Sequence, residues 1–194
     1  MPSPRSVDPL RIRQLTPGDD RSGFASGHES LDRFFRLYAG QNQFRRHLGV
    51  TYVAVDSRGI AGFMTVAAGE LAAERVTRDR GPHPLPILRL ARLAVQMNAR
   101  GRGIGEALLF EALRLAVAMK TSVGCAGVVV DAKPEAVAFY ARYGFVAFEA
   151  FEGASPAQPP STPMFLAVRR IEAACGRTLP RCSLPDRAPR PPSR

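Results

Sequence analysis

Residues 100–105 read Arg-Gly-Arg-Gly-Ile-Gly (RGRGIG), between an apolar segment at 87–96 (ILRLARLAVQ) and a long amphipathic pattern at 104–120. Apolar residues recur in that pattern at intervals of three and four, which predicts a helix. A glycine-rich turn that enters a helix leaves backbone N–H groups unpaired at the positive end of the helix dipole. The segment therefore predicts a strand, a turn and a helix that bind a phosphate or diphosphate group.

Three kinds of phosphate-binding turn can be compared with this segment. A P-loop requires a Lys-Ser or Lys-Thr pair after its glycines, and none follows here. A dinucleotide-binding turn requires G-x-G-x-x-G, but the frame that starts at Gly101 ends on Glu106, whose carboxylate would face the anion. Arg100, Gly103 and Gly105 fill the remaining pattern, R/Q-x-x-G-x-G/A. A glycine turn without a ligand stays an alternative at this point.

The rest of the chain predicts strands that alternate with helices only in its second half, which favours a mixed α/β or α+β sheet. A helical region at 26–47 is expected to break at Gly40, and residues 80–86 form a Pro-rich loop. Strands are predicted at 11–15, 50–55, 60–67, 87–96, 127–131, 145–151 and 164–168, with a hairpin between 50–55 and 60–67, a loop at 153–163 and a further helix at 134–143.

Three segments accompany the turn in a fixed order: LARLAV at 90–95, VVVD at 128–131 and FYARYGF at 139–145. With this combination, residues 10–170 resemble the GNAT superfamily of N-acetyltransferases. The resemblance implies a central, mostly antiparallel twisted sheet with helices on both faces. In that sheet the strands 88–96 and 127–131 run parallel and splay apart. It also implies acetyl-CoA as cosubstrate and no metal.

The resemblance also assigns roles to residues. The pantetheine arm would pair with the backbone of Leu93 and Val95, and Tyr140 would be the general acid that protonates the leaving thiolate. Tyr143 is the competing tyrosine, but it falls at a variable position of the family pattern F-Y-x-x-x-G-F. The pyrophosphate would lie on backbone N–H groups between Gly101 and Glu106. The full set implied for acetyl-CoA is Leu93, Ala94, Val95, Arg100, Gly101, Arg102, Gly103, Ile104, Gly105, Glu106, Asp131 and Lys133.

Shorter segments resemble a narrower branch, the tRNA-acetylating toxins of type II toxin–antitoxin systems (TacT-like). They are FASGHESLDRFF at 24–35, TYVAV at 51–55, VDAK at 130–133 and PMFL at 163–166. Ser26 departs from the branch, which often has Cys there. The branch implies acetyl transfer to the α-amine of aminoacyl-tRNA, a ribbon-helix-helix antitoxin as partner, and a homodimer. Two alternatives stay open: acetylation of a protein N-terminus, a lysine or a small amine, and a non-catalytic nucleic-acid-binding module.

The chain carries a net charge of +10, and half of that excess falls in residues 169–194, which contain seven arginines and only two acidic residues. Such a charge favours a polyanionic partner, and tRNA is one. Arg36, Arg46 and Arg92 are candidates for the tRNA-binding surface, against the alternative that each is simply solvated. We expect a loose N-terminus at 1–10, the acetyltransferase domain at 11–170 and a disordered, solubilising or RNA-binding tail at 171–194.

Several classes of protein are disfavoured. Three cysteines at 125, 175 and 182 are too few and scattered for a disulfide framework or a zinc site. No apolar run is long enough to span a bilayer, and the N-terminus lacks a signal-peptide core. We therefore expect a soluble, cytoplasmic protein without a membrane partner.

Overall fold

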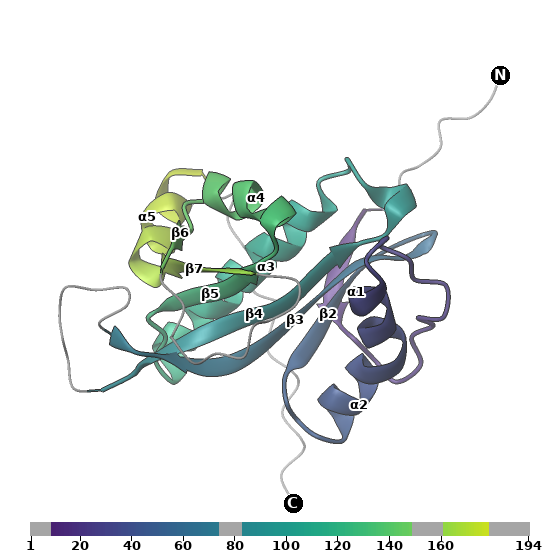
Figure 1. The fold of residues 1–194 in the computed structure, drawn as a ribbon, viewed down its shortest axis with the longest axis horizontal. Helices are drawn as coiled ribbons and strands as arrows, with labels where there is room; N and C mark the ends of the chain where they lie inside the picture. Colours follow the sequence, from purple (N-terminus) through teal and green to yellow (C-terminus); the bar gives the residue numbers. More distant parts are fainter. Residues whose placement is uncertain (1–8, 74–82, 149–160, 179–194) are drawn as a thin grey trace, which may run out of the picture.

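The computed structural model describes residues 9–73, 83–148 and 161–178. These residues form one twisted sheet of seven strands in the order β1-β2-β3-β4-β5-β7-β6 (Figure 1). All neighbouring strands are antiparallel except β4 and β5, which are parallel. This confirms the predicted fold class. The strands are β1 (Arg11–Gln14), β2 (Val50–Asp56), β3 (Gly59–Leu71), β4 (Leu85–Val95), β5 (Gly127–Ala132), β6 (Val146–Ala147) and β7 (Thr162–Ala167).

The parallel pair separates along its length. β4 and β5 are in register only from Ile87 opposite Gly127 to Leu90 opposite Val130. Beyond Leu90, β4 continues to Val95 beside β3 alone. The separation starts at a β-bulge, because Leu90 lies opposite Val66 and Arg92 opposite Thr65, which leaves Ala91 as an extra residue. A bulge bends its strand and increases the local twist, which accounts for the splay.

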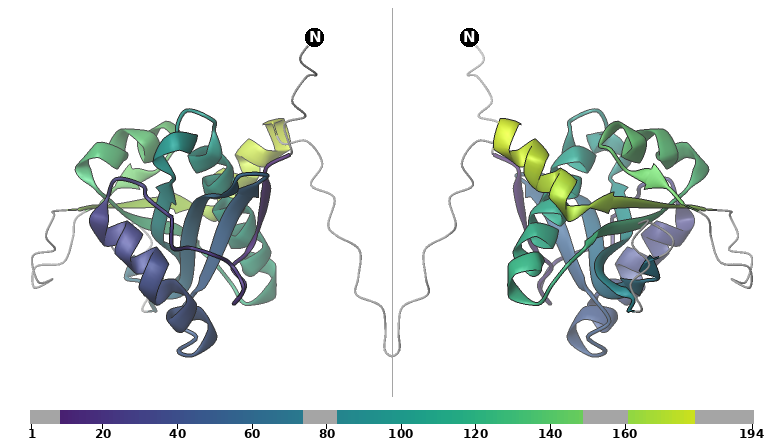
Figure 2. Two further views of the ribbon diagram at one scale, coloured as in Figure 1. Left: turned by 90° about the vertical axis from the view of Figure 1, so that its right-hand side faces the viewer. Right: turned by 90° about the vertical axis from the view of Figure 1, so that its left-hand side faces the viewer.

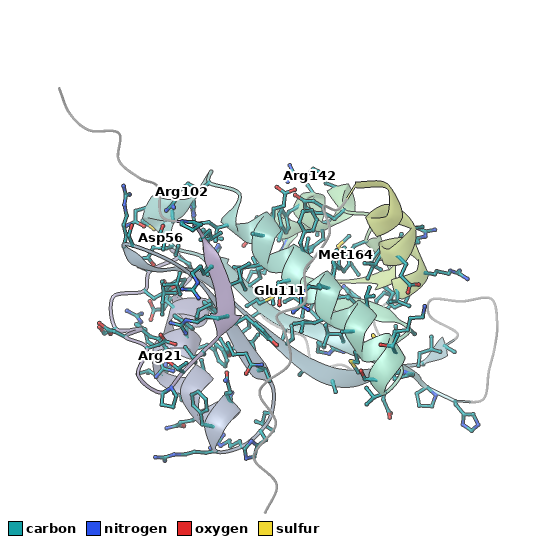
Figure 3. The ribbon with its side chains drawn as sticks, turned by 180° about the vertical axis from the view of Figure 1, so that it is seen from behind. Arg21, Asp56, Arg102, Glu111, Arg142 and Met164 are labelled. Carbon is teal, nitrogen blue, oxygen red and sulfur yellow. The ribbon has the colours of Figure 1, made fainter. Side chains whose placement is uncertain are left out.

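Helices cover both faces of the sheet (Figures 1 and 2). On one face lie α3 (Ile104–Ser122), α4 (Val137–Arg142) and α5 (Val168–Thr178), and Figure 3 shows α3 from that side. Their main core includes Leu90, Leu108 and Val130. The other face carries α1 (Glu29–Arg33), η1 (Phe34–Tyr38) and α2 (Ala39–Phe44) over a cluster of phenylalanines. In that cluster Phe35 stacks on Phe63 with ring centroids 4.2 Å apart.

The expected helix break at Gly40 is wrong. The backbone stays helical from α1 through α2, and the irregularity is instead the π-helical segment η1. Gly40 lies inside α2, where a Cβ atom would come within 2.7 Å of Nη1 of Arg21. A glycine inside a helix costs only about 1 kcal/mol relative to alanine. Here glycine makes room for an arginine rather than ending a helix.

Three other expectations need correction at their ends. β4 begins at Leu85, inside the predicted Pro-rich loop. The strand expected at 145–151 is β6, only two residues long as described, and 149–151 lie outside the described residues. Residues 171–178, expected in the tail, belong to the helix α5 (Val168–Thr178), and Ile171 on it is 3% exposed within the main core. The remaining residues of the expected tail, 179–194, lie outside the described part.

Candidate active site

The turn before α3 has the backbone that its glycines permit. Gly101 and Gly103 have φ angles of +76° and +74°, a region that other residues rarely adopt. A Cβ atom at either position would meet nothing within 4 Å, so this surface of the turn is open. Gly103 is the N-cap of α3 and no side chain caps the helix, which leaves the N–H groups of Ile104, Gly105 and Glu106 free within the described structure. The predicted sequence of strand, glycine turn and helix is thus observed, with backbone N–H donors at the start of α3.

A hollow of about 190 Å³ opens at this turn. Seven of the predicted residues line it, namely Val95, Arg100, Gly101, Gly103, Ile104, Gly105 and Glu106. The far wall comes from α4, through Phe139 and Arg142. Sequence reasoning did not select Arg142, although it lies within FYARYGF. The Nη2 atom of Arg142 donates to the Tyr143 hydroxyl at 2.6 Å, which fixes a cation at the edge of the hollow.

Arg100 is tied to the loop that precedes α1. Its Nη2 atom donates to the Ser26 carbonyl oxygen, and the Ser26 hydroxyl donates to buried Asp32 at 2.5 Å. The Met97 N–H donates to the Ala25 carbonyl at 2.9 Å, which adds a second link between loop and turn. Gly27, with φ +85°, makes this approach possible because a Cβ atom there would lie 3.1 Å from Sδ of Met97. The loop before α1 therefore fixes the position of the glycine turn.

Three residues predicted to contact acetyl-CoA lie elsewhere. Arg102 is paired with Asp56 at 2.6 Å, and Figure 3 shows this pair well apart from Arg142. This pair lowers the pKa of Asp56 below its ordinary value, because the carboxylate accepts hydrogen bonds from Arg102 and from the Arg58 N–H. Asp131 is paired with Arg89 at 2.6 Å, and neither Asp131 nor Lys133 lines the hollow.

The open edge of β4 presents backbone groups. The Gln96 N–H donates to the Ala61 carbonyl at 2.9 Å, so the peptide groups of Gln96 point toward β3. Peptide groups alternate along a strand, and those of Leu93 and Val95 therefore point away from β3, into the splay. Ala94 turns its own side chain into the phenylalanine cluster on the other face. Within the described residues, the backbone groups of Leu93 and Val95 are thus not paired with β5, and these are the residues to which the resemblance assigns the pantetheine arm.

Tyr140 lies on α4 and is 8% exposed, packed edge-on against Phe139 and Phe145. Burial raises the pKa of Tyr140 to about 12, so the hydroxyl is protonated at neutral pH. Its hydroxyl makes no hydrogen bond within the described residues. Tyr143, the alternative, is half-buried, and its hydroxyl is occupied by Arg142. These environments favour Tyr140 over Tyr143 as a proton donor.

The three arginines expected at the tRNA-binding surface differ in environment. Arg36 approaches Glu29 at 3.8 Å and donates to the Asp32 carbonyl at 3.3 Å. Arg46 is exposed, just beyond the end of α2. Arg92 stacks on Phe34, with its guanidinium carbon 3.7 Å from the ring centroid, and burial lowers its pKa. Of the three, Arg92 is the one that stacks on an aromatic ring.

Within the described residues, no group of three or more His, Cys, Asp or Glu side chains can hold a metal ion. Nor does any described helix have the length and hydrophobicity to cross a membrane. Cys125 is a buried free thiol whose Sγ contacts the Gly127 carbonyl at 3.3 Å.

Comparison with known proteins gives a consistent result. Residues 47–147 match the family model for an acetyltransferase (GNAT) domain. The chain is 34% identical over 137 residues to a tRNA-acetylating toxin of Mycobacterium tuberculosis, with 69% of this chain and 82% of the relative aligned. A bacterial toxin crystal structure superimposes with a TM-score of 0.77 at 25% identity, over 90% of this chain and 99% of that one. The toxin AtaT, complexed with acetyl-methionyl-tRNAfMet, shares the fold with a TM-score of 0.75 at 21% identity, over 86% and 99% of the two chains.

Proposed function

Because this chain belongs to the GNAT family of acetyltransferases, we propose that it transfers acetyl from acetyl-CoA to the α-amine of an aminoacyl-tRNA and thereby blocks translation as a toxin. The observation that carries the proposal is the junction of the open β4 edge with the uncapped start of α3, beside a buried, protonated tyrosine. The tRNA acceptor is supported by the curated relative, whose name states that activity.

The hollow fits the diphosphate of acetyl-CoA. Free N–H groups at Ile104, Gly105 and Glu106 supply donors at the positive end of α3, and Arg100 and Arg142 add positive charge. The Glu106 carboxylate lines the same hollow, so the diphosphate is bound by its backbone N–H and not by its side chain. From the hollow, the pantetheine arm would enter the splay and pair with Leu93 and Val95 as an added strand.

The reaction requires a neutral amine, a stabilised oxyanion and a proton for the leaving thiolate. An α-amine has a pKa of about 7.7–8.0 and is partly neutral at physiological pH, so no strong protein base is needed. The amine nitrogen attacks the thioester carbonyl, and the Leu93 N–H is the donor placed to stabilise the oxyanion. The ammonium of the tetrahedral intermediate releases its proton to solvent. The C–S bond then breaks, the Tyr140 hydroxyl protonates the sulfur, and solvent returns a proton to the tyrosinate.

The α1–α2 face supplies the acceptor side in this proposal, with Arg36, Arg46 and Arg92 as contacts to tRNA. Phosphate contacts of this kind give affinity that does not depend on sequence. We extend the proposal to a cytoplasmic homodimer neutralised by a ribbon-helix-helix antitoxin, as implied by the toxin branch. The acetyltransferase domain comprises residues 11–170, with α5 added to it because Ile171 packs in the main core.

The test is to incubate the protein with acetyl-CoA and aminoacylated total tRNA, and to identify the acetylated aminoacyl species by mass spectrometry. We expect N-acetyl-aminoacyl adenosine after nuclease digestion. Deacylated tRNA is the matched control, since it lacks the α-amine. If peptides or free lysine become acetylated and charged tRNA does not, the toxin activity is refuted and the general acetyltransferase activity stands.

A further inference from the structure

Arg92 is a cation without an anionic partner among the described residues. Its guanidinium lies 3.7 Å from the centre of the Phe34 ring, it is half-buried, and burial lowers its pKa. Within the described residues no carboxylate or carbonyl accepts a hydrogen bond from it. An aromatic face compensates part of the lost hydration, but it uses none of the five N–H donors of the group. Arg92 therefore keeps its hydrogen-bonding capacity for a ligand.

The neighbouring cation on the same strand is different. Arg89 is paired with Asp131 on β5 at 2.6 Å, at the point where β4 and β5 are still in register. Arg92 comes after the bulge at Ala91, where β5 has already separated from β4. The splay thus removes the strand that would otherwise supply Arg92 with a partner.

The position of Arg92 relates it to the reacting groups. Its side chain points to the α1–α2 face, as its stack on Phe34 shows. The next residue, Leu93, turns its peptide group into the splay, where the thioester carbonyl would lie. An anion bound by Arg92 would therefore lie on the acceptor side of the sheet. It would also lie close to the site of acetyl transfer, because Arg92 is adjacent in the chain to Leu93.

We propose that Arg92 binds the 5′-phosphate of the acceptor's 3′-terminal nucleotide. The inference rests on the proposed function, and it names the feature that distinguishes an aminoacyl-tRNA from other amines. In that acceptor only the ester and the ribose separate the α-amine from this phosphate. A planar guanidinium held on one face by Phe34 presents its edge to two phosphate oxygens in a bidentate pair. A peptide N-terminus or a lysine offers no phosphate at this distance.

The orientation of Phe34 depends on the π-helical segment η1. This segment makes Phe34 and Phe35 both point to the sheet, where Phe35 lies flat on Phe63 and Phe34 lies 6.3 Å from the same ring. Phe34 is 6% exposed, so it cannot move away from the guanidinium without opening the cluster. π-Helical turns occur often at functional sites. Phe34 is accordingly the positioning residue for Arg92.

The experiment compares two acceptors that differ by one group: 3′-O-aminoacyl adenosine and its 5′-phosphate. For the wild-type protein we expect kcat/KM to be about ten-fold or more higher for the phosphorylated acceptor, the range of a charge-assisted hydrogen bond. Arg92→Gln should reduce this ratio close to one, mainly by raising KM for the phosphorylated acceptor. Arg92→Lys keeps the charge but loses the planar pair, and should give an intermediate ratio.

Arg114→Gln is the matched control, because it removes the same charge from α3 on the opposite face, where Arg114 is paired with Glu111. We expect it to keep the wild-type ratio. If the wild-type protein shows no phosphate preference, or if Arg92→Gln lowers both acceptors equally, the inference is wrong. If the wild-type protein acetylates only the phosphorylated acceptor, the KM for that acceptor is compared between wild type and Arg92→Gln. A raised KM in the variant supports the inference, and an unchanged KM refutes it. Failure of the proposed function has a separate readout, since charged total tRNA would then stay unacetylated by the wild-type protein.

Discussion

Replacing Tyr140 by phenylalanine tests the chemistry of the site most directly. The change removes one hydroxyl group and keeps the ring that packs against Phe139 and Phe145. That hydroxyl has no hydrogen-bond partner within the described residues, so its removal leaves no other described group unpaired. The change therefore separates catalysis from stability.

The expected loss of turnover follows from the role of a general acid. Positioned acids and bases contribute about 10²- to 10⁴-fold to rate. This corresponds to roughly 3–5 kcal/mol of transition-state stabilisation. For Tyr140→Phe we expect kcat to fall by about that factor, with an unchanged Kd for acetyl-CoA, because the diphosphate hollow does not include Tyr140. The free energy of unfolding at pH 7 should change by less than about 1 kcal/mol.

Stability at high pH gives a second measurement on the same variant. The pKa of Tyr140 is about 12 in the folded protein, against an ordinary value of 10.0. As pH rises from 10 to 12, the unfolded chain loses this proton more readily than the folded one, so stability falls by roughly 2 kcal/mol over that interval. Tyr140→Phe should remove that part of the alkaline loss. Denaturant titrations at pH 8 and pH 11 measure the difference.

Tyr143→Phe is the matched control on the same helix, since its hydroxyl accepts a bond from Arg142 and lies outside the proposed chemistry. We expect its kcat to stay within a few-fold of wild type. Single-turnover rates, measured by release of free CoA thiol, compare the two variants without interference from product release. Wild-type turnover in Tyr140→Phe, or an equal loss in both variants, would refute the assignment.

Gly103→Ala should raise KM for acetyl-CoA, which steady-state kinetics would measure. It should destabilise the fold by only about 1–2 kcal/mol, because a side chain at φ +74° is strained although the space around it is open, and thermal unfolding would measure this loss. Gly127→Ala should destabilise by about 3 kcal/mol or more, since its Cβ would come within 2.3 Å of the Leu166 carbonyl oxygen; unchanged denaturant unfolding would contradict this. Asp19→Asn should lose about 1 kcal/mol at pH 7, discounted because its partner Arg13 is 42% exposed. The pKa of Asp19 is lowered by that pair, so the loss should shrink progressively as pH falls below 4, and equal losses at pH 3 and pH 7 would contradict this.

Local patterns predicted the part of the site that consists of backbone. Gly103 and Gly105 fall at fixed spacing before an amphipathic helix, and such a turn has few alternative conformations. The open edge at Leu93 and Val95 followed from the family resemblance. The groups of the turn are close in sequence, whereas the open edge also depends on where β5 separates from β4.

Side chains with distant partners were predicted less well. Arg102 stands inside the motif, yet Asp56 from the β2–β3 turn pairs with it and holds it outside the hollow. Arg142 was missed because its position on α4 matters only once α4 lies over the start of α3. Pairing of this kind depends on the tertiary fold, and a sequence pattern does not contain it.

The helix α5 illustrates a different limit. Residues 168–178 follow β7 without an intervening turn, and their arginines give the composition of a solvated tail. Ile171 packs in the main core, and Lys120 of α3 pairs with Glu172 at 2.7 Å. Few contacts of this kind suffice for a terminal helix, because most helical stability in proteins comes from tertiary packing.

The single extra residue at Ala91 has a consequence for how specificity can diverge. Past that bulge, alternate residues of β4 have separate roles in the proposed reaction: the peptide groups of Leu93 and Val95 would bind the acetyl donor, and the side chain of Arg92 would bind the acceptor. Donor binding by main-chain atoms is insensitive to side-chain identity. Substitutions at residues 34 and 92 can therefore retune the choice of acceptor while acetyl-CoA binding is preserved. Deleting Ala91 would end this independence, because a one-residue slip exchanges the two sides of the strand.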